Sequence, residues 1–148
     1  MNFPIKAFCL RGNTKDEKIE VVIEELFGFP HEMSYDGGYD FRGTLNIRAG
    51  SFAVNNATIE GSTGALSRFF SSLKQCYQSL DGTAEVYRSL DEEFVFSLKM
   101  TKLGHAVIEG KFLDPHSSNK LIFEIKTDQT YMFATINELR DIENLFGN

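Results

Sequence analysis

Paired carboxylates are the side chains of this sequence best suited to chemistry. Asp36 and Asp40 flank Gly37 and Gly38 in the stretch YDGGYD, and carboxylates beside flexible glycines can bind a cation. A calcium loop needs the spacing D-x-D-x-D-G followed by a glutamate, which this stretch lacks. Residues 91–93 are three further adjacent acids in an expected turn, where solvated side chains are typical. The sequence therefore predicts no metal site, and it predicts a flexible loop at the two glycines.

Histidines and cysteines are too scattered to form a recognisable metal site or disulfide framework. His31, His105 and His116 form no HxH, HExxH or HxxxH pair, and the last two fall in expected turns. Cys9 and Cys76 lie far apart with no CxxC, so we expect them to be free thiols. Cys76 falls on the apolar face of an expected helix, where a buried, inert thiol is typical.

Enzyme motifs are also missing from the sequence. The stretch GSTGALS, residues 61–67, leads into a helix but has no lysine to meet a phosphate. No GxSxG or other triad context occurs. We therefore expect no enzymatic activity, no catalytic residue and no cofactor, although a site assembled from distant elements would leave no motif.

Residues 127–130, TDQT, could be a catalytic loop or the start of a helix. They separate a strand-like run ending at Ile125 from a helix-like run that begins near Met132. A helix start needs a side-chain oxygen to accept one of its unpaired backbone N–H groups. An acid there also suits the positive end of the helix dipole. We therefore expect Asp128 or Thr130 to cap a helix.

The net charge of −6 is concentrated in residues 13–40, which hold eight acidic and two basic residues, whereas the rest of the chain is balanced. An acidic protein is disfavoured on phosphate backbones, but its field attracts a basic protein partner. A solvated face without a partner is the alternative interpretation. The expected partner-binding residues are Glu20, Glu24, Glu25, Asp36 and Asp40.

The elements that must position these residues indicate an α+β fold in a single domain, residues 1–148. We expect a meander-like antiparallel β-sheet of about six to eight strands, with two amphipathic helices packed against it. Fourteen Phe and no Trp predict a Phe-rich core. Residues 15–27 fit either a helix or a strand, and alternation of Ile19, Val21 and Ile23 with Glu20 and Glu24 favours the strand.

The chain carries no apolar run long enough to span a membrane and no signal-peptide pattern, which predicts a cytoplasmic location.

The remaining order of features supports comparison with a known family. It comprises an I-E-V-V-I run ending in F-P (Ile19–Pro30), Tyr39–Asp40 before a strand (Thr44–Ile47), a helix with Leu66, Phe69 and Leu73, a turn at Gly82, three strands, and F-x-I-x-T-D-Q-T leading into a helix.

This pattern, over residues 19–146, resembles the WapI-like immunity proteins of bacterial polymorphic and contact-dependent toxin systems. The resemblance implies a small cytoplasmic antidote without enzymatic activity, which binds a toxic domain, often a nuclease, and occludes it. No catalytic residue is carried over. An acidic surface suits a basic toxin, because complementary charge raises the association rate and specificity.

Two other functions remain open from the sequence. A small-molecule-binding or enzymatic domain would hold a pocket between sheet and helices, with polar groups converging on it. A structural subunit would expose a large apolar patch.

Overall fold

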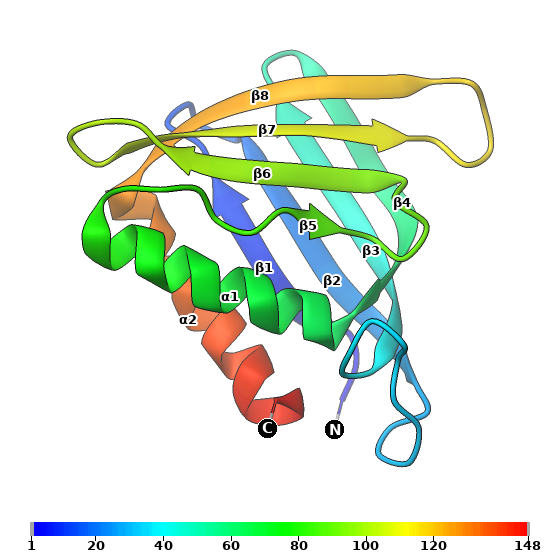
Figure 1. Cartoon of the computed structure of the whole chain (residues 1–148). Coiled ribbons are helices and arrows are strands. Elements are labelled where there is room, and N and C mark those ends of the chain that lie inside the picture. Colours follow the sequence, from blue (N-terminus) through cyan, green and yellow to red (C-terminus); the bar gives the residue numbers. More distant parts are fainter. Residues whose placement is uncertain (1, 148) are drawn as a thin grey trace.

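The computed structural model describes residues 2–147, which form eight strands and two helices (Figure 1). In chain order these are β1 (Ile5–Arg11), β2 (Lys18–Phe27), β3 (Asp40–Ala49), β4 (Phe52–Ser62), α1 (Thr63–Ser79), β5 (Tyr87–Arg88), β6 (Phe94–Met100), β7 (His105–Leu113), β8 (Lys120–Asp128) and α2 (Gln129–Phe146).

The strands form two antiparallel meanders rather than one continuous sheet. The first has the order β1-β2-β3-β4 and the second β5-β6-β7-β8. Each meander is followed by a helix, so the order of four strands and a helix occurs twice. In Figure 1 the strands of the second sheet cross those of the first, and α1 packs beside α2, which lies along β1. The predicted α+β class, strand number and two helices are confirmed, and the division into two sheets is a new finding.

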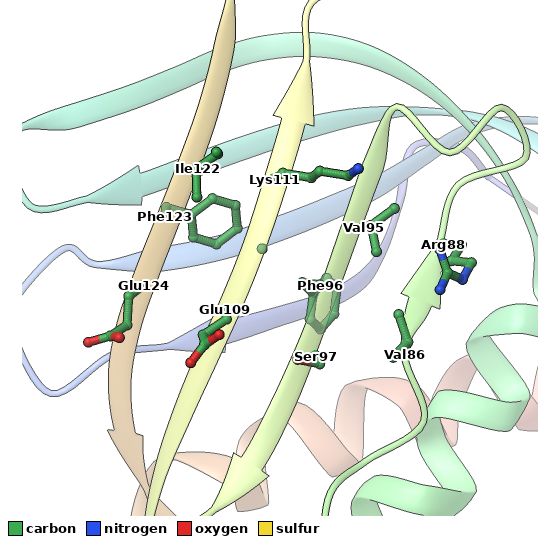
Figure 2. A pocket seen from close by; sticks show the side chains of 11 residues that line it. Val86, Arg88, Val95, Phe96, Ser97, Glu109, Lys111, Ile122, Phe123 and Glu124 are labelled. Atoms are coloured by element: carbon green, nitrogen blue, oxygen red, sulfur yellow. The ribbon is translucent and has the colours of Figure 1, made fainter.

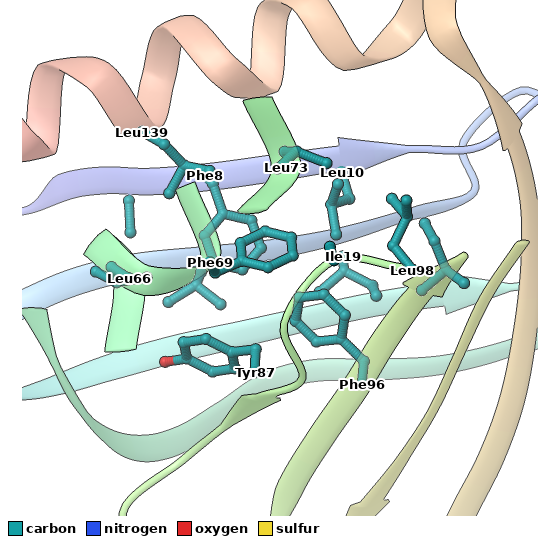
Figure 3. Close-up of a cluster of buried hydrophobic side chains, with 14 of the residues drawn as sticks. Phe8, Leu10, Ile19, Leu66, Phe69, Leu73, Tyr87, Phe96, Leu98 and Leu139 are labelled. Carbon is teal, nitrogen blue, oxygen red and sulfur yellow. The ribbon is translucent and has the colours of Figure 1, made fainter. Parts of the chain in front are cut away.

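Aromatic rings fill the space between the two sheets and α1. Phe8 from β1, Phe69 from α1 and Phe96 from β6 meet with ring centroids 5.2–6.0 Å apart. The Tyr87 ring stacks on Phe96 at 5.5 Å (Figure 3). One buried cluster joins side chains of both sheets and both helices. The predicted Phe-rich core is therefore present, and it occupies the region in which the sequence placed an alternative ligand pocket.

Residues 18–27 form a strand, which settles the ambiguity in the N-terminal third. Ile19, Val21 and Ile23 are completely buried, whereas the alternate residues Glu20 and Val22 are partly exposed. This period of two places the β-branched side chains against the core. The strand register against β1 and β3 then fixes where each glutamate lies.

Both helices begin at a capping side chain. Ser62 Oγ accepts a hydrogen bond from the Ala65 N–H at 3.1 Å, and Asp128 Oδ1 accepts one from the Thr130 N–H at 2.8 Å. Thr127 Oγ1 donates to the carbonyl oxygen of Arg11 at 2.6 Å and so joins β8 to β1. The TDQT stretch is thus the junction of a strand and a helix, as its residue types predict.

Candidate partner-binding surface

The outer face of the first sheet, which points away from the core, carries the glutamates of β2. Arg42 and Thr44 of β3 are two residues apart and therefore share one face of that strand. Arg42 Nε lies 3.5 Å from Glu25 Oε2, and Thr44 Oγ1 donates to Glu24 Oε1 at 2.9 Å. The β2–β3 register shifts between Ile23 and Glu25, so a bulge keeps both glutamates beside β3.

Glu20 continues this row toward the start of β2. Asn46 of β3 donates to Glu20 Oε1 at 3.4 Å, and Lys6 Nζ of β1 lies 3.8 Å from Glu20 Oε2. The Glu20 side chain is only 19% exposed, whereas that of Glu25 is 54% exposed. Glu25 is therefore more accessible to a partner, whereas the Glu20 side chain is largely buried against Asn46 and Lys6.

The acidic stretch of the sequence acquires cations from neighbouring strands on folding. Lys6 comes from β1 and Arg42 from β3, and each is ion-paired with a glutamate of β2. Arg48 lies on the same face of β3 as Arg42. The outer face is consequently a mixed polar surface with ordered carboxylates, rather than a continuous negative patch.

Asp36 belongs to the β2–β3 loop and is attached to α1. Its carboxylate accepts hydrogen bonds from Ser62 Oγ at 3.0 Å and from Arg68 Nη2 at 3.1 Å. Arg68 Nη1 also donates to the Asp36 carbonyl oxygen at 2.9 Å. Asp36 therefore fixes the loop to the first turns of the helix and is 34% exposed at its side chain.

Asp40 opens β3 opposite Phe27, the last residue of β2. Its Oδ1 atom is buried and finds no hydrogen-bond partner within residues 2–147. Asp40 lines a recess of about 120 Å³ together with Phe27, Gly28, Glu32, Met33 and Ser34. Asp40 and Arg42 are two residues apart, so Asp40 lies at the end of the same polar row of β3.

The structure thus places four of the five predicted residues on one sheet face and its rim: Glu20, Glu24, Glu25 and Asp40. Asp36 lies apart from them, beside α1. Tyr35 and Met33, which the sequence did not single out, are among the most exposed large side chains, at 88% and 65%. A loop has no periodicity that distinguishes an exposed aromatic residue from a buried one. The only sequence feature that pointed to exposure of Tyr35 and Met33 was their position among glycines and acids.

A hollow of about 670 Å³ lies on the outer face of the second sheet and not between sheet and helices (Figure 2). Its floor is formed by β6, β7 and β8, and the exposed Ile122 lies on β8 at the edge of the sheet. Glu109 and Glu124 lie opposite each other across β7 and β8, and Lys111 lies on the same face. The surface is open and mixed in charge, which differs from the enclosed, convergent lining of a small-molecule site.

Several ionisable groups outside the two surfaces described above have shifted pKa values. Partial desolvation, with Asp91 nearby, raises the pKa of the Glu93 carboxyl in the turn before β6. Burial raises the pKa of the Cys9 and Cys76 thiols, which are free. Within residues 2–147 no three His, Cys, Asp or Glu side chains are grouped so as to hold a metal ion.

These features define a small α+β protein whose candidate residues lie on an open polar surface. The chain belongs to the WapI-like immunity protein family, whose model matches residues 9–147. No curated protein and no solved structure matched the chain. Membership supports a role as an immunity protein in a toxin system, which implies that the chain binds a cognate toxin. No helix in residues 2–147 is long and apolar enough to cross a membrane.

Proposed function

We propose that this protein neutralises a cognate nuclease-type toxin in the cytoplasm by binding the toxic domain and occluding it, without catalysis. The family match over residues 9–147 is the observation that carries this proposal. A nuclease must approach phosphate groups, which favours Lys and Arg on its substrate-binding surface. An acidic inhibitor presents complementary charge to that surface and raises the rate of productive encounters.

The proposed contact residues are Glu20, Glu24, Glu25, Asp36 and Asp40. Hydrogen bonds from Thr44 and Ser62 restrain the carboxylates of Glu24 and Asp36 before any partner arrives. Restrained side chains lose little conformational entropy on binding, which favours affinity. A single core joins both sheets and both helices, which supports action of the chain as one domain.

Capture from the native host tests the proposal. Tagged protein is incubated with an extract in which neighbouring genes are expressed, washed, and eluted with a salt gradient, and the eluted proteins are identified by mass spectrometry. We expect one basic partner with a nuclease domain, released as ionic strength rises. An extract that yields no such partner would contradict the proposal.

A charge-matched pair of variants tests the contact residues. Glu24→Lys with Glu25→Lys changes the charge of the first sheet, and Glu109→Lys with Glu124→Lys makes the same change on the exposed face of the second. We expect only the first pair to weaken capture. Equal capture by wild type and both double variants would exclude Glu24 and Glu25 from the interface.

A further inference from the structure

The β2–β3 loop, residues 28–39, exposes large apolar side chains at one end of the molecule. Tyr35 is 88% exposed, Met33 65% and Phe29 40%. Isolated exposed apolar residues are ordinary on protein surfaces, but here three occur within seven residues. Tyr and Met are enriched at protein interfaces, because they supply large contact areas. The loop therefore carries the side chains that an interface anchor requires.

Hydrogen bonds from α1 restrain the middle of the loop at Asp36 and Gly37. Arg68 of α1 donates to both the carbonyl oxygen and the carboxylate of Asp36. The Gly64 N–H donates to the Gly37 carbonyl oxygen at 3.2 Å, which fixes the loop to the start of the same helix. A side chain at Gly64 would overlap the Gly37 carbonyl group, so this approach requires glycine. A pre-ordered loop binds at a lower entropic cost than a mobile one.

The same loop folds over the recess that contains Asp40. Glu32 and Met33 from the loop, with Phe27 from β2, line its walls, and the buried Asp40 Oδ1 lacks a partner within residues 2–147. Residues 27–40 contain three acids and no Lys or Arg. A buried acceptor oxygen is stabilised by a donor, most strongly by a charged one. The recess, lined by two acids beside Phe27 and Met33, is therefore complementary to a cationic side chain.

We propose that loop 28–39 is the principal docking surface for a basic segment of the partner protein. A lysine or arginine side chain of that segment enters the recess beside Asp40, and Tyr35 and Met33 pack against its apolar atoms. This inference rests on the proposed function, because it names how the toxin is held. It differs in placing the main contact at the loop rather than along the β2 glutamates.

Small cations test the recess without any toxin. The full chain, labelled with ¹⁵N, is titrated with n-butylguanidinium or n-butylammonium, with neutral butyramide as the control probe. We expect saturable shifts of the amide signals of Gly28, Glu32, Ser34 and Asp40 with the cations only. Asp40→Asn preserves the shape of the side chain and should weaken binding about tenfold, which corresponds to about 1.4 kcal/mol. Absent shifts, or equal binding by Asp40→Asn with an unchanged spectrum elsewhere, would overturn the inference.

The captured toxin tests the anchor. Tyr35→Ala should weaken its binding by about 30-fold, the loss expected for an aromatic hot spot. Phe52→Ala removes another exposed ring, 66% accessible, from β4 and should leave affinity unchanged. Capture of a toxin that both variants bind equally well would reject the docking surface and leave the proposed function intact. Guanidinium binding without any captured toxin would support the recess and reject the proposed function.

Discussion

Arg11 of β1 and Glu138 of α2 are joined by two hydrogen bonds, with Arg11 Nη2 2.9 Å from Glu138 Oε2 and Nη1 3.3 Å from Oε1. Glu138 Oε1 also accepts the backbone N–H of Cys9 at 3.0 Å. Strand β1 is at the edge of its sheet, where backbone groups would otherwise be unpaired. The helix therefore covers an edge that could pair with another chain.

Replacement of Glu138 tests this edge contact. Glu138→Ala leaves the Cys9 N–H and the Arg11 guanidinium without their acceptor, and should lower the free energy of unfolding by about 2 kcal/mol. Glu138→Gln keeps one acceptor oxygen and should cost less. Urea denaturation measures both. Equal stability of wild type and Glu138→Ala would show that the contact contributes nothing.

The cap of α2 predicts a smaller effect. Asp128→Ala removes the acceptor for the Thr130 N–H and should cost about 1 kcal/mol of stability. Asp128→Asn keeps a good capping oxygen and is the matched control. Thermal unfolding followed by circular dichroism compares them. A loss of partner binding with an unchanged melting temperature would instead give Asp128 a functional role.

The same residue predicts a pH dependence. Hydrogen bonds from the Thr130 hydroxyl and backbone N–H hold the pKa of the Asp128 carboxyl below its ordinary value of 3.8. A lowered folded-state pKa contributes stability above pH 3.8, which is lost as the pH falls through the folded pKa. The stability advantage of wild type over Asp128→Asn should therefore shrink as the pH falls below 3.8. An advantage that grows with acid would contradict this assignment.

Tyr87 offers a substitution that should not destabilise the core. Its side chain is 1% exposed, and its hydroxyl has no partner within residues 2–147. Burial, with Asp36 nearby, raises the pKa of this phenol. Tyr87→Phe keeps the stacked ring and removes an unsatisfied group, so the free energy of unfolding should rise by about 1 kcal/mol. A clear decrease would reveal a hydrogen bond to the hydroxyl.

Gly38 and Gly50 both have positive φ. Ala variants at these two positions distinguish displacement of the β2–β3 loop from backbone strain alone. Gly38 has φ +66°, and an added methyl group would overlap Thr63 Oγ1. Gly50 has φ +60° with no atom within 4 Å of that position. Both Ala variants should lose about 1 kcal/mol from the left-handed backbone. Only Gly38→Ala should also displace the loop and weaken partner binding. Equal effects of the two variants on partner binding would contradict a role for loop 28–39 in that binding.

Local signals predicted the elements of this fold well. The alternation of Ile19, Val21 and Ile23 favoured a strand for β2, and Asp128 or Thr130 was expected to cap α2, because each signal depends on residues adjacent in sequence. The division into two sheets depends on strand pairing across long separations, which a single sequence does not encode in any local period.

The candidate surface shows the same limit. Counting charges located the acidic stretch, but the count could not show that Lys6 and Arg42 would lie against Glu20 and Glu25. The bulge at Glu24 could not be predicted from the sequence either, because it is defined by the register of β2 against β3. Strand periodicity could therefore predict which face of its own strand an acidic residue occupies, but not which residues of neighbouring strands lie beside it.

The most direct test of the account is titration of the captured toxin domain's nuclease activity with the purified protein. If the protein neutralises by occlusion, activity falls in proportion to added protein and disappears at one equivalent. The toxin should be recovered chemically unchanged and active after the complex is dissociated at high salt. Nuclease activity that persists in excess protein, despite stable binding, would contradict neutralisation by occlusion.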